Sequence, residues 1–132
     1  MKNFFLHIAL FFSIIVFSQN EQLAQNYFDK GDFEKAKISF EELLKSQPGN
    51  GYYFQKVIDC YQQLQQYDIA EKVIRERLDR YKQSSLLVEL GYNYQLQKNT
   101  AKAKEYYDQA IDKIKKNPNE VYGIAGTFER RV

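Results

Sequence analysis

The feature that most constrains this chain is a pattern that repeats about every 34 residues. Three alanines, Ala36, Ala70 and Ala103, recur at intervals of 34 and 33 residues. A large apolar or aromatic residue follows each alanine by four positions, and a tyrosine precedes each one by nine. Three copies in nearly the same register are hard to obtain by chance. They predict a chain built from stacked copies of one supersecondary unit.

The spacing of apolar residues inside each copy is helical. In the first copy an apolar face runs from Leu23 to Phe28, and Gly31 then interrupts it. A second amphipathic stretch runs from Phe33 to Leu44 and ends before Pro48. One helix pair cannot bury both of its faces, so it must stack on the next pair. The sequence therefore predicts an all-α fold of antiparallel helix pairs, with small residues where two helices approach most closely.

These residues resemble the tetratricopeptide repeat, a 34-residue helix–turn–helix with the pattern aromatic-x2-Leu-Gly-x2-Tyr, then Ala-x3-Phe, then Pro. The resemblance implies about three helix pairs plus one extra helix, wound as a right-handed superhelix. It gives repeats at about 17–50, 51–83 and 84–117, and a partial fourth repeat at 118–132. The matching residues are Leu23, Ala24, Tyr27, Gly31, Phe33, Ala36, Phe40 and Pro48 in copy one; Phe54, Val57, Ile58, Tyr61, Tyr67, Ala70 and Ile74 in copy two; and Leu87, Leu90, Gly91, Tyr94, Ala103, Tyr107 and Ala110 in copy three.

The second copy departs from the family pattern. Ile58 stands where a small residue is expected, and Arg77 stands where the family usually has alanine. Lys82 replaces the terminal proline, which predicts a second helix longer than usual. The related pentatricopeptide class has a 35-residue period and reads RNA, and the observed spacing disfavours it. We therefore expect no nucleic-acid partner.

Residues 1–18 resemble a secretory signal peptide. A basic start at Lys2 precedes the apolar run Phe4–Phe17, which is shorter than the roughly 20 apolar residues needed to span a bilayer. Cleavage after Ser18 would release residues 19–132 as the repeat domain. Such a chain would be exported, whether periplasmic, envelope-associated or secreted, and would keep no membrane span. An uncleaved anchor and a buried strand are the alternatives for this run.

The composition disfavours catalysis. The only histidine, His7, lies in the segment that cleavage would remove, and Cys60 is the only cysteine. A mature chain without histidine cannot build ordinary Ser–His or Cys–His pairs or a histidine metal site. The net charge of +2 is too small for a nucleic-acid or membrane-surface footprint. We therefore expect no enzyme, no metal and no cofactor; an enzyme using carboxylates alone is the remaining catalytic alternative.

The family resemblance implies a scaffold with a protein or peptide partner, because tetratricopeptide repeats hold their ligands in a groove lined by the first helix of each pair. Such a groove would be rich in amide side chains, which can both donate hydrogen bonds to an extended backbone and accept hydrogen bonds from it. The family's carboxylate-binding Lys and Asn are missing at the matching positions, so a carboxylate clamp is not expected. A merely solvated helix face is the alternative reading. The groove positions carried onto this chain are Gln25, Asp29, Gln55, Asp59, Gln62, Gln63, Tyr92 and Gln95.

The partial fourth repeat has no second helix in the sequence to cover it. Asn117, Pro118 and Glu120 give this segment a helix start of the Asn-cap and Pro-first type. We expect either a longer repeat protein or an end that docks on another chain, including a second copy. The second functional hypothesis follows: a spacer or oligomerisation element of a longer envelope protein, with no ligand in the groove.

Overall fold

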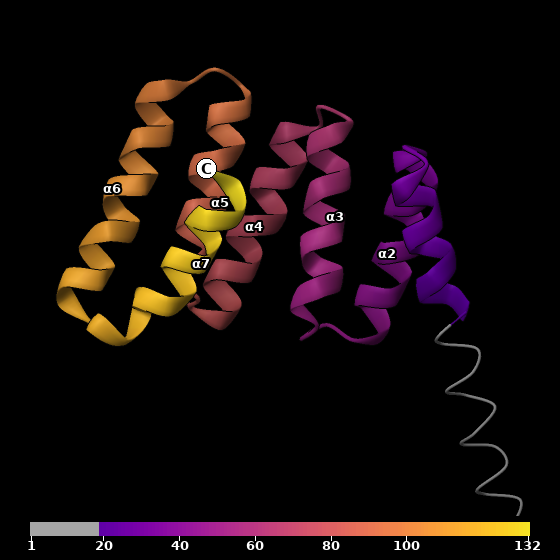
Figure 1. Ribbon diagram of the computed structural model, residues 1–132, viewed down its shortest axis with the longest axis horizontal. Helices are drawn as coiled ribbons and strands as arrows, with labels where there is room; N and C mark the ends of the chain where they lie inside the picture. Colours follow the sequence, from indigo (N-terminus) through magenta and orange to yellow (C-terminus); the bar gives the residue numbers. More distant parts are fainter. Residues whose placement is uncertain (1–18) are drawn as a thin grey trace, which may run out of the picture. The chain divides into compact units, whose positions relative to one another are not determined.

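A computed structural model describes residues 19–132, and the described residues form helices joined by turns, with no strand among them (Figure 1). The predicted all-α fold is confirmed. The described residues divide into two compact units: the first ends at Leu64, and the second is Gln65–Val132. The predictions of a signal peptide and of its cleavage fall on residues 1–18, which lie outside the described residues.

The first unit contains a helical segment at 19–29, α2 (Phe33–Ser46) and α3 (Gly51–Gln63). Its core joins side chains from all three helices, including Ala24, Phe40 and Val57. Asn50 begins α3, because its side-chain oxygen accepts hydrogen bonds from the backbone N–H groups of Tyr52 and Tyr53, at 3.0 and 3.1 Å. This cap fixes the register of the helix that carries several predicted groove residues.

The second unit contains α4 (Tyr67–Tyr81), α5 (Leu86–Leu96), α6 (Thr100–Lys116), the short 3-10 helix η1 (Pro118–Glu120) and α7 (Val121–Arg131). The helix α5 is central: it packs against α4, α6 and α7, and it runs antiparallel to α6 (Figure 1). Most of its residues are buried. The core of this unit includes Leu87, Val88, Ala110 and Ile124.

The repeated small residues lie inside the protein. Ala36 and Ala70 have no exposed surface, and Ala103 is 4% exposed. Gly91 is buried in α5, where the ring of Tyr107 from α6 lies against it. Small side chains at these positions let neighbouring helices approach closely, as the repeat pattern predicts.

The turns before α2, α4 and α6 share one backbone feature. Gly31, Gln65 and Lys98 stand two residues before α2, α4 and α6, and they have φ angles of +76°, +57° and +59°. Only the first of these positions carries glycine, the residue that adopts a positive φ without steric cost. The turn geometry is therefore set by the repeat and is imposed on two non-glycine residues.

The predicted extension of the second helix in copy two is wrong. The helix α4 ends at Tyr81, because Lys82 adopts a left-handed conformation with φ of +53° and donates its backbone N–H to Leu78 at 2.8 Å. A left-handed residue ends a helix without any need for proline.

The predicted helix start at Asn117 is confirmed. The Asn117 side chain accepts a hydrogen bond from the backbone of Asn119 at 3.3 Å, and Pro118 is the first helical residue. The first turn is 3-10 before α7 continues as an α-helix. Among residues 19–132, no helix is both long enough and apolar enough to cross a membrane.

Candidate functional site

The first unit presents a polar surface formed by Gln25 and Asp29 of helix 19–29 and by Tyr52, Gln55 and Asp59 of α3. Gln25 Nε2 donates to Asp29 Oδ1 at 2.6 Å, and Gln25 Oε1 accepts from the Tyr52 hydroxyl at 2.7 Å. On α3, Gln55 Nε2 donates to Asp59 Oδ1 at 3.2 Å. Four predicted groove residues therefore form two hydrogen-bonded pairs. Tyr52, which the sequence analysis missed, joins the first pair to α3.

A cation lies over aromatic rings beside this first polar surface. Lys56 Nζ is 3.8 Å from the ring centroid of Phe28 and 5.7 Å from that of Tyr52. Tyr52 is 44% exposed, and its ring packs edge-on against that of Phe40, with centroids 6.1 Å apart. Such cation–ring contacts are favourable and hold the lysine stem in place. The surface thus combines carboxylates, amides, an ammonium group and an exposed aromatic ring.

A second tyrosine fixes the spacing of the two helices that carry this surface. The hydroxyl of Tyr53 on α3 donates to Glu21 Oε2 on helix 19–29 at 2.7 Å. Burial, with the hydrogen bond to Glu21 adding to it, raises the pKa of Tyr53 to about 12. The hydroxyl therefore stays protonated at physiological pH and remains a donor.

The two neighbouring glutamines at the end of α3 differ in exposure. Gln62 is 5% exposed, whereas Gln63 is exposed. Gln62 follows the fully buried Ile58 by four residues and so lies on the inner face of α3. Gln62 therefore offers little surface to a ligand, and Gln63 offers more.

In the second unit, Tyr92 and Gln95 of α5 form a second polar surface together with Arg130 and Arg131 of α7. The guanidinium carbon of Arg131 lies 4.9 Å from the ring centroid of Tyr92. Gln95 Oε1 accepts a hydrogen bond from the hydroxyl of Tyr107 on α6 at 2.8 Å. The two predicted groove residues of copy three are therefore held by side chains from the helices on either side.

A buried carboxylate underlies this second polar surface. Glu89 of α5 is 2% exposed; its Oε1 accepts from Arg130 Nη2 at 3.1 Å, and its Oε2 accepts from Arg131 Nε at 2.9 Å. Burial raises the pKa of Glu89, and the two nearby arginines oppose that rise without cancelling it. The sequence analysis missed this site, although a lone carboxylate within the apolar run Leu86–Leu90 was a signal for it.

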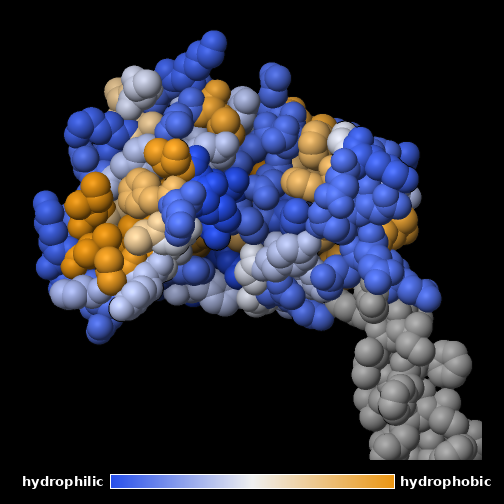
Figure 2. Space-filling model, viewed as in Figure 1, coloured by the Kyte–Doolittle hydropathy of each residue, from blue (hydrophilic) through white to orange (hydrophobic). Residues whose placement is uncertain are grey.

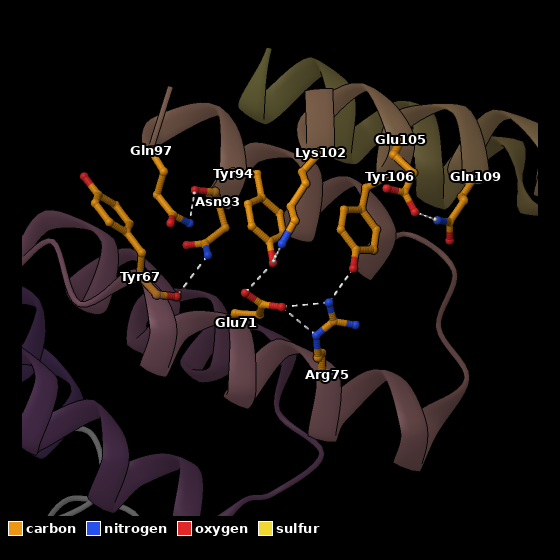
Figure 3. Close-up of polar contacts among 10 residues, drawn as sticks. All are labelled: Tyr67, Glu71, Arg75, Asn93, Tyr94, Gln97, Lys102, Glu105, Tyr106 and Gln109. Atoms are coloured by element: carbon orange, nitrogen blue, oxygen red, sulfur yellow. Dashed lines mark hydrogen bonds and ion pairs between the residues drawn. The ribbon is translucent and has the colours of Figure 1, made fainter. Parts of the chain in front are cut away.

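A second set of polar contacts ties α4, α5 and α6 together (Figure 3). The hydroxyl of Tyr94 donates to Glu71 Oε2 at 2.7 Å, and Arg75 Nη2 lies 2.7 Å from Glu71 Oε1. Arg75 also donates to the hydroxyl of Tyr106, whose ring stacks on that of Tyr94. Burial alone would raise the pKa of Glu71, but hydrogen bonds from Tyr94 and Arg75 hold it below the usual value. Each of these groups is engaged by its neighbours, so the network serves to fix helix positions.

The described residues offer groups for binding and few for catalysis. Within 19–132, no three His, Cys, Asp or Glu side chains gather in a way that could hold a metal ion. Cys60 is fully buried, and burial, with the charge of Asp59 adding to it, raises the pKa of its thiol to about 12. A thiol with that pKa is a poor nucleophile at neutral pH. Both surfaces present amides, a cation and a tyrosine ring, and the first polar surface also presents carboxylates.

The sequence of this chain matches a family model. The model of the tetratricopeptide repeat matches residues 20–50 and 84–112. The chain carries tetratricopeptide repeats. The two matched segments correspond to the first and third copies of the pattern. The second copy, which contains Ile58 and Arg77 at positions where the repeat has small residues, lies between them.

Two solved structures share the tetratricopeptide-type helical fold. One is PcrH in complex with the chaperone binding region of PopB: the TM-score is 0.62 at 16% identity, covering 86% of this chain and 93% of that one. The other is the type III secretion translocator chaperone SycD of Yersinia enterocolitica, in an alternative dimer: the TM-score is 0.61 at 18% identity, covering 86% and 92%. At these identities the likeness shows the fold alone. No curated protein has a sequence close enough to this one to count as a relative.

Proposed function

We propose that this protein is a non-catalytic scaffold whose two polar surfaces bind extended segments of a partner protein outside the cytoplasm. The observation that carries the proposal is that Gln25 and Phe40 hold Tyr52 in place while the residue is still 44% exposed. A rigid, partly exposed tyrosine next to amides suits protein recognition, because it supplies contact area at low entropic cost. An extended segment has unpaired backbone N–H and C=O groups, which amide side chains satisfy.

The fold of the solved relatives supports the same proposal. The PcrH structure contains a bound region of PopB, so a chain of this architecture accommodates a segment of another protein there. In this chain we assign the contacts to Gln25, Asp29, Gln55, Asp59, Gln63, Tyr92 and Gln95, with Gln62 as a buried support.

The proposal that the chain is exported rests on the basic start and the apolar run at residues 4–17. Cell fractionation and the intact mass of the exported chain test it: a mature form beginning at Gln19 supports export, and a full-length cytoplasmic form contradicts it.

Site-specific photocrosslinking in the native host tests the scaffold proposal. A photoreactive phenylalanine analogue replaces Tyr52 or Tyr92, and the matched control replaces Tyr81 of α4, which is as exposed as Tyr52 at 44%. We expect one discrete crosslinked partner from the two surface positions and none from Tyr81. Equal crosslinking from all three positions would contradict binding at the polar surfaces.

The spacer or oligomerisation hypothesis is favoured by one observation on α7. Tyr122 is 87% exposed and Val132 is 72% exposed, and Figure 2 shows apolar side chains on the face where α6 and α7 lie. Size-exclusion chromatography with light scattering on the wild type and on Tyr122→Ser tests this second function. A concentration-dependent dimer lost in Tyr122→Ser favours oligomerisation, whereas a monomer at all concentrations removes its support.

A further inference from the structure

We propose that Arg130 binds a carboxylate of the bound segment, so that the second polar surface selects acidic partners. The carboxylate belongs either to an Asp or Glu side chain or to the segment's C-terminus. This inference rests on the proposed function, because it names the chemistry of the segment that the scaffold holds. It does not involve the positions at which the family's usual carboxylate clamp would lie.

Arg130 shares its carboxylate partner with a second arginine. One carboxylate faces two guanidinium groups, and each of its oxygens accepts a hydrogen bond from one of them. Glu89 therefore gives Arg130 only part of its negative charge. A charge left at a partly buried position is stabilised by an incoming group of opposite sign more strongly than a fully solvated charge is.

The guanidinium of Arg130 is accessible, and that of Arg131 is not. The side chain of Arg130 is 52% exposed, whereas that of Arg131 is 10% exposed and lies against Tyr92. Arg130 uses only Nη2, which contacts Glu89 Oε1 at 3.1 Å and Thr127 Oγ1 at 3.4 Å. A guanidinium has five N–H donors, so the donors on Nε and Nη1 are available to a ligand. Each of these donors can form a charge-assisted hydrogen bond to a carboxylate oxygen.

The surroundings of Arg130 leave room for a ligand. Gly126 lies one turn earlier on α7, and apart from the neighbouring backbone of α7 no atom lies within 4 Å of the position that a Cβ would occupy there. A glycine inside a helix weakens it, and it lets another backbone approach closely. Tyr92 adds a half-buried aromatic wall beside Arg131. Among residues 19–132, Glu89 is the only acidic side chain in ion-pair contact with Arg130.

Binding of defined peptide pools tests the inference. Four pools of labelled nine-residue peptides have the same degenerate flanking residues. Three pools have an amidated C-terminus and carry Glu, Gln or Lys at the central position. The fourth pool carries Gln at the centre and has a free C-terminus. Fluorescence anisotropy with the chain as purified from its expression host gives the apparent Kd of each pool. We expect the Glu pool or the free-carboxylate pool to bind about three- to ten-fold more tightly than the amidated Gln pool, and the difference to shrink at high salt. Tighter binding of the Glu pool identifies a side-chain carboxylate as the ligand, and tighter binding of the free-carboxylate pool identifies the C-terminus.

Variants separate this inference from the scaffold proposal itself. Arg130→Gln should abolish the preference for carboxylate, so that the Glu, free-carboxylate and amidated Gln pools bind alike, and Arg130→Lys should keep part of the preference. Arg80→Gln, at an exposed arginine of α4, is the matched control and should change nothing. Circular dichroism checks that each variant is folded.

Equal binding of the Glu, free-carboxylate and amidated Gln pools to the wild type, or a preference for carboxylate that survives in Arg130→Gln, overturns the inference and leaves the scaffold proposal intact. Failure of every pool to bind overturns both.

Discussion

Gly91 of α5 lies directly against the ring of Tyr107 of α6. A Cβ atom built on Gly91 would overlap with Cδ1 and Cε1 of that ring. Tyr107 is four residues after Ala103, so the two halves of the repeat pattern meet at this contact. The absence of a side chain at Gly91 is therefore what allows α5 and α6 to pack as a pair.

We predict that Gly91→Ala lowers the free energy of unfolding by about 1–3 kcal/mol, because the methyl group overpacks the contact with Tyr107. Urea denaturation measures the change. Gly126→Ala is the matched control: apart from the neighbouring backbone of α7, its Cβ would meet no atom within 4 Å, so better helix propensity should raise the stability by about 0.5–1 kcal/mol. Effects of the same sign at both positions would contradict the packing argument.

The positive φ angles of the turns give a second prediction. Gln65→Gly and Lys98→Gly should each raise the free energy of unfolding by about 0.5–1 kcal/mol, since glycine removes the steric cost of a left-handed backbone. Gly31→Ala, at the same position of the first copy, should lower it for the same reason. Thermal or urea unfolding of the three variants measures these changes. No gain at either Gln65 or Lys98 would mean that the turns are not strained.

The pH dependence of stability should separate two carboxylates of the second unit. Burial raises the pKa of Glu89 in the folded state, so the folded chain binds a proton there more readily than the unfolded chain does. The stability of the wild type relative to Glu89→Gln should therefore increase as the pH falls from neutral through the folded pKa of Glu89.

Glu71 should behave in the opposite way. Its folded pKa is lowered, because the hydrogen bonds from Tyr94 and Arg75 outweigh burial. The stability that ionised Glu71 contributes is measured as the difference between the wild type and Glu71→Gln. It is fully present above the unfolded-state pKa and should be lost as the pH falls through the folded-state pKa. Urea titrations between pH 7 and pH 3 measure both differences, and slopes of equal sign would contradict this assignment.

The thiol of Cys60 should be inert in the folded chain. It has no exposed surface, and its pKa is about 12. We expect no reaction with a disulfide reagent such as DTNB at pH 8, and full reaction of one thiol in urea. The reagent's absorbance follows both. Rapid reaction without denaturant would show that α3 opens readily in the first unit.

The sequence predicted the parts of the fold that depend on local spacing. The burial of Ala36, Ala70 and Ala103 follows from the 34-residue period, and the start of the last helix follows from Asn117 and Pro118. The left-handed turn at Lys82 could not be predicted, because nothing in a lysine signals a positive φ.

The features that depend on tertiary contacts could not be predicted from the sequence. Glu89 and Arg130 are 41 residues apart, and they meet only because α7 packs on α5. The 87% exposure of Tyr122 depends in the same way on how α7 packs. The difference between Gln62 and Gln63 likewise depends on a helix rotation that the spacing of glutamines does not fix.

The most direct test of the scaffold is to select peptides and map where they bind. Peptides enriched from a displayed random library are titrated into isotope-labelled chain, and backbone NMR shifts are recorded. The account predicts shifts concentrated on helix 19–29, α3, α5 and α7, with Tyr52 and Tyr92 among the largest. No enrichment of any sequence, or shifts confined to α2, α4 and α6, would contradict it.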